Sequence, residues 1–316
     1  MHNGLFHKAF ILISKKSLSS KRYICRSFTL DFPGGKTAAI VVCVATYLDN
    51  ILTFHRERAL KEKESLPLDE LVKKADDYNT TNGLPRSLSA HLQNNTETPE
   101  DIPRLIAEIK KHSPSKGNLQ IGLDPVATAR EYESGGASAI SVLTDEPHFK
   151  GHLSYLEQVK NAVALPVLRK DFLVSKEDVL ISRIRGADAI LLIVAALSDE
   201  ELATMHETAL SLSMDVLVEI HDENELARAM AIKPAIIGIN QRDLHSFAID
   251  TKRAIRLRSS IGTDIITVAE SGINSFADML LLGSEGFDAA LVGENLVIQN
   301  DRCLAVQKLL GKQTAI

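Results

Sequence analysis

The sequence predicts an α/β protein whose main part is a closed (β/α)8 barrel of the TIM type, preceded by a helical extension. Three observations lead to this prediction. Short apolar runs recur between residues 103 and 312, helical stretches lie between them, and charged or amide side chains follow most of the runs. The length of 316 residues is sufficient for one such barrel and an extension.

Residues 1–46 form a basic extension with no acidic residue before Asp31. This composition resembles an organellar transit peptide. The alternative, which we favour, is a disordered segment without a function. The chain has no run of about 18 apolar residues, so we expect no membrane span. We therefore expect a cytoplasmic protein, with an organellar location as the alternative.

Residues 47–102 predict a helical segment. Charged and apolar positions recur at helical spacing over residues 47–75. Pro67 interrupts this pattern and divides it into two helices, because proline lacks an amide donor and clashes with the preceding turn. Residues 76–100 are rich in Asn, Thr, Ser and Pro, which predicts a loop with one short helix near Leu88–Leu92.

The barrel is predicted over residues 103–312. Eight apolar runs indicate strands, at 104–109, 138–143, 166–169, 187–194, 215–220, 235–240, 264–269 and 287–292. Helical stretches between them include Pro125–Ser134, Ser175–Arg185, Asp199–Ser211, Glu223–Lys233 and Ser275–Gly283. Fully buried strands that alternate with helices are typical of a parallel sheet. An open, doubly wound sheet is the alternative, but it needs a glycine-rich turn where Lys-His-Ser-Pro-Ser-Lys stands.

Catalytic groups of such barrels lie at the carboxyl ends of the strands. Strand alternation directs Glu108 and Lys110 to the same side. Converging lysines and glutamates perturb each other's pKa values and suit general acid–base catalysis. The alternative is a rim of structural salt bridges. Six of the eight predicted strands end in such side chains: Glu108 and Lys110, Lys170 and Asp171, Glu219, Asn240 and Arg242, Glu270, and Glu294 and Asn295.

Glycines follow the last two predicted strands, at Gly272 and Gly293. Their backbone amides can approach an anion closely, and the corresponding loops of these barrels often bind phosphate. The alternative is that both are ordinary turn residues. A sugar phosphate is the expected class of ligand.

Several other functions are disfavoured. The net charge of −5 and the aromatic content of 5% argue against a nucleic-acid binder. His148 and His152 lie four residues apart, but no third ligand follows at a suitable spacing, so we expect no metal site. Asp222 after His221 is predicted to cap the next helix. The three cysteines, Cys25, Cys43 and Cys303, suggest neither a disulfide framework nor a zinc site.

Six segments of the barrel resemble the successive strand motifs of indole-3-glycerol-phosphate synthases. They are IAEIKKHSPSKG, VLRKDF, LVEIHDENEL, IGINQRDL, VAESGI and LVGENL. The resemblance extends from about Tyr47 to Leu310 and leaves residues 1–45 without a counterpart. It implies a helical extension that partly covers the barrel mouth, which we assign to residues 47–102.

The resemblance also implies the reaction. This family converts 1-(2-carboxyphenylamino)-1-deoxyribulose 5-phosphate to indole-3-glycerol phosphate, CO₂ and water in tryptophan biosynthesis, without a cofactor or metal. Competing hypotheses are a phosphoribosyl isomerase, which would lack the helical extension and the Glu108–Lys110 pair, and a catalytically silent binding module, which would lack Lys170 or Glu219. We expect no nucleic-acid or membrane partner, a monofunctional chain, and a monomer or homodimer.

The catalytic roles implied by the resemblance involve seven side chains. Lys170 would be the general acid that protonates the substrate carbonyl oxygen, and Glu219 its acid–base partner. Lys110 would bind the carboxylate and phosphate region and share acid duties, while Glu108 would orient the lysines. Asn240 would hold the anthranilate portion, and Glu270 and Ser271 would contact the ribulose hydroxyls.

Substrate binding is implied for a second group. Phe149 and Phe172 would flank the aromatic ring. The other positions would serve the phosphate end and its surroundings: Ser113, Arg242, Gly272, Gly293 and Glu294. Asn295 departs from the serine that the family often has, so we expect weaker or altered phosphate contact there.

Overall fold

The computed structural model describes residues 23–32, 36–93, 102–120, 122–243 and 248–312. The chain divides into two compact units, Met1–Asp49 and Asn50–Ile316. The first unit contains an antiparallel hairpin of β1 (Tyr23–Phe32) and β2 (Lys36–Ala45). Both strands lie within the predicted basic extension of residues 1–46. Residues 1–22 and 33–35 of the predicted basic extension lie outside the described residues.

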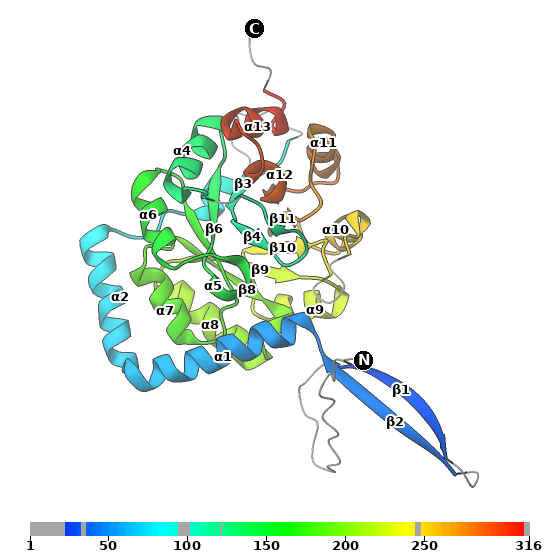
Figure 1. The fold of residues 1–316 in the computed structure, drawn as a ribbon. Helices are drawn as coiled ribbons and strands as arrows, with labels where there is room; N and C mark the ends of the chain where they lie inside the picture. Colours follow the sequence, from blue (N-terminus) through cyan, green and yellow to red (C-terminus); the bar gives the residue numbers. More distant parts are fainter. Residues whose placement is uncertain (1–22, 33–35, 94–101, 121, 244–247, 313–316) are drawn as a thin grey trace, which may run out of the picture. The chain divides into compact units, whose positions relative to one another are not determined.

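The second unit is a closed barrel of eight parallel strands, as predicted (Figure 1). Hydrogen bonds join the strands in chain order, and the last strand pairs with the first. Each strand overlaps one predicted apolar run. The strands are β3 (Arg104–Ile109), β6 (Ala139–Leu143), β7 (Val167–Lys170), β8 (Ala189–Ile193), β9 (Asp215–Ile220), β10 (Ile236–Asn240), β11 (Ile266–Glu270) and β12 (Ala289–Val292).

Helices surround the strands (Figure 1). They are α4 (Pro125–Gly135), α5 (Glu146–Phe149), α6 (Ser154–Ala162), α7 (Lys176–Ile184), α8 (Asp199–Ser211), α9 (Glu223–Ala231), α10 (Thr251–Arg258), α11 (Phe276–Ser284), α12 (Glu294–Val297) and α13 (Arg302–Leu309). A short 3-10 helix, Val194–Ala196, and a small hairpin, β4 (His112–Ser113) and β5 (Gly117–Asn118), complete the unit. Asp222 caps α9 by accepting a hydrogen bond from the amide of Glu225, as predicted. Within the described residues no helix is both long and apolar enough to cross a membrane.

Helix α1 (Tyr47–Ser65) contacts the catalytic side of the barrel through residues 50–65. Its polar side chains bond to groups that follow the carboxyl ends of strands, at the starts of α5, α7 and α8. The contacts are His55 with Asp145 at 2.8 Å, Arg56 with Glu201 at 2.6 Å and Arg58 with Asp178 at 2.5 Å. This part of the extension therefore lies against the loops that follow the carboxyl ends of the strands.

Helices α2 (Leu68–Asn82) and α3 (Leu88–Leu92) do not lie at the mouth, and here the expectation for residues 47–102 is wrong. The amide of Ser89 donates to Asp215 at the start of β9. Leu88 and Leu92 are fully buried beneath the barrel's amino-terminal end, and each contributes about 1.5–3 kcal/mol through burial. The extension thus runs from one end of the barrel to the other.

The second helix is also longer than predicted, because tertiary contacts stabilise residues that favour loops in isolation. The buried guanidinium of Arg183 donates to Asn79 Oδ1 at 2.5 Å and to the Gly83 carbonyl at 2.6 Å. It also lies over the ring of Tyr78, 4.9 Å from its centroid. These contacts fix the last turn of α2, within the region predicted as a loop.

Asp188 connects the extension to the lower part of the barrel. Its buried carboxylate accepts hydrogen bonds from the Arg86 amide at 2.8 Å, the Val167 amide at 2.9 Å and Lys160 Nζ at 2.5 Å. Burial lowers the pKa of Lys160 more than its hydrogen bond to Asp188 raises it. Three separate segments therefore depend on one carboxylate.

We expect Asp188→Ala to lower the free energy of unfolding by about 3–5 kcal/mol, because it leaves a buried ammonium and two amides without their acceptor. Asp199→Ala is the control, since the Asp199 side chain is 80% exposed in its ion pair with Arg228, and we expect about 1 kcal/mol or less. Urea unfolding measures both. Equal losses in the two variants would contradict the assigned role.

Candidate active site

Lys170 lies at the centre of the carboxyl ends of the strands. It ends β7, and its ammonium is 3.0 Å from Glu219 Oε2 at the end of β9 and 3.4 Å from Glu270 Oε2 at the end of β11. The Lys170 side chain is 14% exposed, and both carboxylates are almost fully buried. The structure thus brings together three of the predicted catalytic residues.

The two glutamates differ in charge although they share one lysine. Burial disfavours the ionised form of each. For Glu219, Lys170, His221 and Asn240 outweigh burial and lower its pKa to about 2. For Glu270, burial and the charge of Glu219 outweigh Lys170 and raise its pKa to about 8. The surroundings of Glu219 therefore favour its ionised form, and those of Glu270 favour its protonated form.

The surroundings of Lys170 stabilise its charged ammonium form. Burial opposes its ammonium form, but Glu219, Glu270 and Glu108 outweigh burial and raise the pKa of Lys170 well above its usual range. The side chain is consequently protonated throughout the neutral range. Such an ammonium can donate a hydrogen bond or a proton to an oxygen that gains negative charge.

Buried Glu108 and half-buried Lys110 form a second ion pair where β3 ends. Their side chains approach to 2.5 Å, between Glu108 Oε1 and Lys110 Nζ. Space for Glu108 is provided by Gly293 on the neighbouring strand end, because a Cβ there would lie 2.3 Å from Glu108 Oε1. Gly238 gives Glu270 the same kind of space, with a distance of 2.2 Å from the Cβ position to Glu270 Oε1.

Asn240 and Ser271 are joined next to Glu219. Asn240 Nδ2 donates to Glu219 Oε1 at 3.1 Å, and Asn240 Oδ1 accepts from Ser271 Oγ at 2.9 Å. Ser271 has a left-handed backbone with a φ of 67°, which is costly for a residue with a side chain. Gln241 compensates, since its Nε2 donates to the Ser271 carbonyl at 2.7 Å. Gln241 therefore supports the site. It belongs to the segment IGINQRDL, but the sequence alone indicates no role for it.

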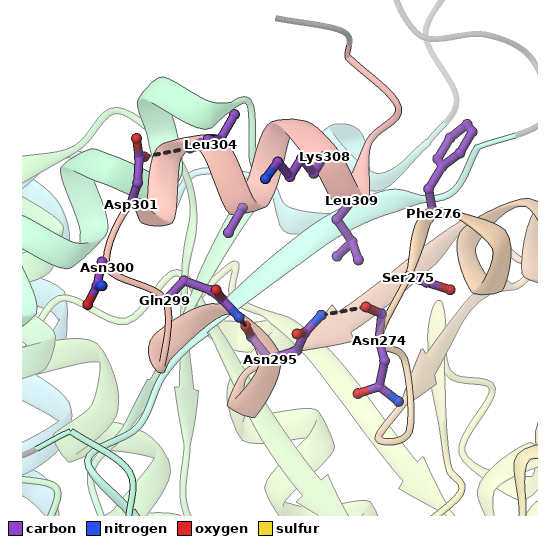
Figure 2. A pocket seen from close by; sticks show the side chains of 11 residues that line it. Asn274, Ser275, Phe276, Asn295, Gln299, Asn300, Asp301, Leu304, Lys308 and Leu309 are labelled. Atoms are coloured by element: carbon purple, nitrogen blue, oxygen red, sulfur yellow. Dashed lines mark hydrogen bonds between the residues drawn. The ribbon is translucent and has the colours of Figure 1, made fainter.

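The predicted phosphate end lies on the loops after β11 and β12. Gly272 has a φ of 77°, and Gly293 and Glu294 begin the short helix α12. Asn295 does not face this end with its amide, because its Nδ2 donates to the Asn274 carbonyl at 2.8 Å (Figure 2). The two residues also line a cavity of about 360 Å³ between α11, α12 and α13. Asn295 therefore joins the two loops.

Ser113, Arg242 and Glu294 are less closely tied to the lysine centre. Ser113 Oγ accepts from the Lys116 amide at 3.2 Å in the loop after β3. The amide of Arg242 donates to Asn240 Oδ1 at 3.0 Å. Glu294 lies 3.7 Å from Lys116 Nζ, and so connects the loops after β3 and β12.

Phe149 and Phe172, the two residues predicted to flank an aromatic ring, lie near each other. The rings of Phe149 and Phe172 lie 6.1 Å apart between centroids. Asp145 positions Phe149, because its Oδ1 accepts hydrogen bonds from the amides of His148 and Phe149. Asp171 positions Phe172 in the same way, through the Phe172 amide at 2.9 Å. Burial raises the pKa of Asp171, but Arg169, His55 and Thr144 outweigh it, and the carboxylate remains ionised.

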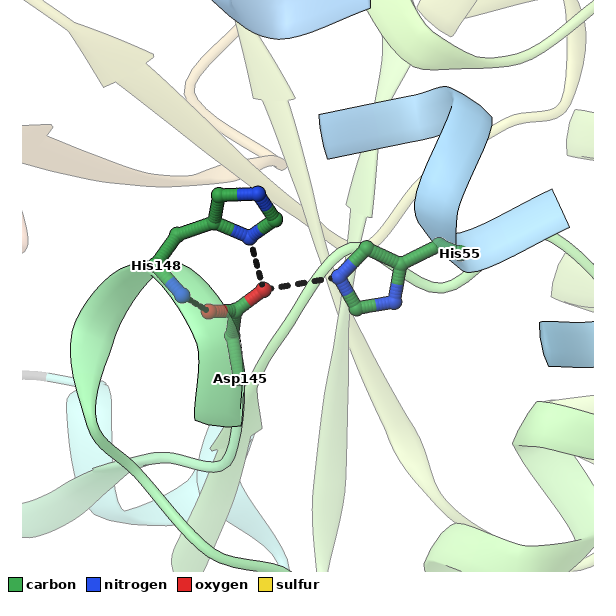
Figure 3. Close-up of side chains that lie close together, drawn as sticks. All are labelled: His55, Asp145 and His148. Atoms are coloured by element: carbon green, nitrogen blue, oxygen red, sulfur yellow. Dashed lines mark hydrogen bonds and ion pairs between the residues drawn. The ribbon is translucent and has the colours of Figure 1, made fainter. Parts of the chain in front are cut away.

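His55, Asp145 and His148 form the cluster of three possible metal ligands found among the described residues (Figure 3). Asp145 Oδ2 lies 2.8 Å from His55 Nε2 and 2.9 Å from His148 Nδ1. These are hydrogen-bond distances to a single shared oxygen. We therefore describe the cluster as a hydrogen-bonded link between α1 and the Phe149 loop. It was missed in the sequence because His55 lies 90 residues from Asp145.

The protonation of Glu270 predicts a pH-dependent stability. A carboxyl group can have a higher pKa in the folded state than in the unfolded state. Such a group makes the protein less stable as the pH rises from the unfolded-state pKa to the folded-state pKa. Glu270→Gln removes that effect, so we expect the variant to gain about 3 kcal/mol over wild type between pH 5 and pH 8. Urea unfolding at both pH values measures it. A difference between the proteins that does not change with pH would show that Glu270 is ionised.

Gly293→Ala tests the space that Glu108 occupies. The added Cβ displaces the Glu108 carboxylate and disrupts its pair with Lys110, so we expect catalytic turnover to fall about tenfold or more. Gly262→Ala is the control, because its Cβ approaches only the flexible side chain of Asp264. Steady-state kinetics compare the two. Full activity in Gly293→Ala would contradict the importance of this geometry.

Comparisons with known proteins identify the family of the chain. The family model described as indole-3-glycerol phosphate synthase matches residues 48–309. An indole-3-glycerol phosphate synthase of Rhodopirellula baltica is 43% identical over 266 residues, which cover 84% of this chain and 99% of that protein. One from Chloroherpeton thalassium is 44% identical over 252 residues, covering 80% and 95%.

Solved structures support the fold. A 3-hexulose-6-phosphate synthase aligns with a TM-score of 0.54 at 16% identity, covering 67% of this chain and all of that one, at 100%. At this identity the likeness concerns the barrel alone. The family model and the sequence relatives, in contrast, span the barrel together with its helical extension. The chain belongs to the indole-3-glycerol phosphate synthase family, whose members are decarboxylating lyases of tryptophan biosynthesis.

Proposed function

We propose that Lys170 and Glu219 carry out the proton transfers by which this family member converts 1-(2-carboxyphenylamino)-1-deoxyribulose 5-phosphate to indole-3-glycerol phosphate, CO₂ and water. One observation carries the proposal. The Lys170 ammonium lies in a buried setting at the barrel mouth, within 3.0 Å of one glutamate and 3.4 Å of another. Such a site holds a proton donor and a proton acceptor side by side.

In the proposed mechanism Lys170 protonates the carbonyl oxygen of the ribulose chain while the aromatic carbon attacks the carbonyl carbon. Departure of the carboxylate as CO₂ restores the aromatic ring. The new hydroxyl then takes a second proton from Lys110 and leaves as water, while a proton is removed from the adjacent carbon to complete the indole. Glu219, ionised in the resting enzyme, accepts a proton in the later steps. Glu270 is protonated before the reaction begins, and it contacts the ribulose hydroxyls together with Ser271.

Substrate orientation is assigned to the surrounding groups. Lys110, held by Glu108, binds the substrate carboxylate and shares acid duties with Lys170, and Asn240 holds the anthranilate portion. Phe149 and Phe172 form the wall against the aromatic ring and exclude water, which favours decarboxylation. The backbone amides of Gly272, Gly293 and Glu294 bind the substrate phosphate. Ser113 and Arg242 contribute nearby.

We also propose that each chain carries a complete active site, in a monomer or a homodimer, because one barrel supplies all the assigned residues. The ligand is a small sugar phosphate. The side chains supply the required acids and bases, so the proposed route needs no cofactor. The relatives come from bacteria such as Rhodopirellula baltica and Chloroherpeton thalassium, which supports a cytoplasmic enzyme; nothing in the comparisons supports the organellar alternative.

The acid–base assignment predicts the kinetics of two variants. We expect Lys170→Ala and Glu219→Gln each to lower kcat by about two or more orders of magnitude. The fluorescence of indole-3-glycerol phosphate reports turnover, without added metal. Lys252→Ala is the control, since Lys252 lies on the exposed start of α10. Full activity in Lys170→Ala would transfer the acid role to Lys110, and no turnover in folded wild type would overturn the proposed function.

A further inference from the structure

His221 is fixed next to the lysine centre by Glu225. It follows β9, two residues after Glu219, and its Nδ1 lies 3.0 Å from Glu225 Oε2. The same carboxylate oxygen accepts the backbone amide of His221 at 2.8 Å. Glu225 is itself buried in the first turn of α9, where Asp222 caps the helix. The imidazole ring is therefore held in one orientation.

The other ring nitrogen faces the predicted base. His221 Nε2 lies 3.4 Å from Glu219 Oε1, and it is buried without a hydrogen-bond partner among the described residues. Glu219 binds Lys170 through its other oxygen, Oε2. Glu219 therefore lies between two basic groups, Lys170 from β7 and His221 from the end of its own strand.

The hydrogen-bond pattern determines where a proton is favourable. The Glu225 carboxylate accepts a hydrogen bond, so His221 Nδ1 carries a hydrogen. In a neutral ring Nε2 would then direct a lone pair at the carboxylate of Glu219, with two acceptors facing each other. A proton on Nε2 removes this repulsion and gives an imidazolium between two carboxylates.

The charged groups around His221 support the same state. Glu219 lies on its own strand and Glu225 on α9, while Arg253 on α10 opposes them. Burial also favours the neutral ring, but the two carboxylates prevail and raise the pKa of His221. A charged His221 supplies Glu219 with a positive neighbour that does not depend on Lys170.

We propose that His221, held by Glu225, is a positioning residue that keeps Glu219 ionised while Lys170 gives its proton to the substrate. When Lys170 becomes neutral, Glu219 loses the closer of its two cations. The imidazolium of His221 remains and preserves the carboxylate for its later role as a proton acceptor. This inference rests on the proposed roles of Lys170 and Glu219.

A first measurement tests the charge of His221 without relying on catalysis. Imidazole resonances are followed by NMR from pH 5 to pH 10, and the His221 signal is assigned as the one absent in His221→Asn. We expect it to titrate above the usual value of about 6.5, and to move down by about one pH unit or more in Glu225→Gln. A His221 signal that titrates below about 6.5 in wild type would overturn the proposal.

A second measurement tests the link to Glu219. We expect kcat of His221→Asn to fall about tenfold or more, with KM changed about twofold or less. We expect the alkaline limb of kcat to move to lower pH in Glu225→Gln. His91→Asn is the control, because His91 is exposed on α3 at the opposite end of the barrel.

The outcomes separate this inference from the proposed function. A Lys170→Ala variant with full activity would overturn the proposed acid, whereas the NMR titration still reports whether His221 is charged. If the pH profile of kcat is the same in Glu225→Gln as in wild type, the role of His221 is overturned and the proposed acid–base pair remains intact. A merely structural role for His221 would change stability but not the position of the alkaline limb.

Discussion

The architecture of the barrel mouth depends on the limited number of positive charges available to its buried carboxylates. Three glutamates, Glu108, Glu219 and Glu270, lie at strand ends where water cannot solvate them. Lys170 lies between two of them, and Lys110 serves the third. Because a buried carboxylate without a cation is costly, the site contains one ionised glutamate and one protonated glutamate around the same lysine.

The backbone is adapted to these charges. Glycines occupy the two positions, 238 and 293, where a Cβ would collide with a carboxylate. Ser271 adopts a left-handed conformation that Gln241 supports from the neighbouring strand end. On the outer side of the mouth, hydrogen bonds through Asp145 and Asp171 place the two phenylalanines. The geometry around the buried glutamates and Lys170 therefore depends on residues that take no part in the chemistry.

The barrel was predictable because its strands are buried on both faces, which leaves continuous apolar runs in the sequence. The lysine centre was predictable because polar residues at the ends of parallel strands must converge. His221 was named but given no function, since Asp222 after it predicts a helix start. Its partner Glu225 falls within the predicted helix of residues 223–233. The last turn of α2 and the position of α3 depend on Arg183, Asp188 and Asp215, which are distant in sequence and give no local signal.

The extension that spans both ends of the barrel affects how the protein forms during synthesis. The ribosome releases residues 50–92 before any strand of the barrel. The partner of Ser89 lies 126 residues later in the chain, and that of Arg86 lies 102 residues later. Both carboxylates, Asp188 and Asp215, therefore emerge only after more than half of the polypeptide. This segment therefore depends on partners that are synthesised well after it.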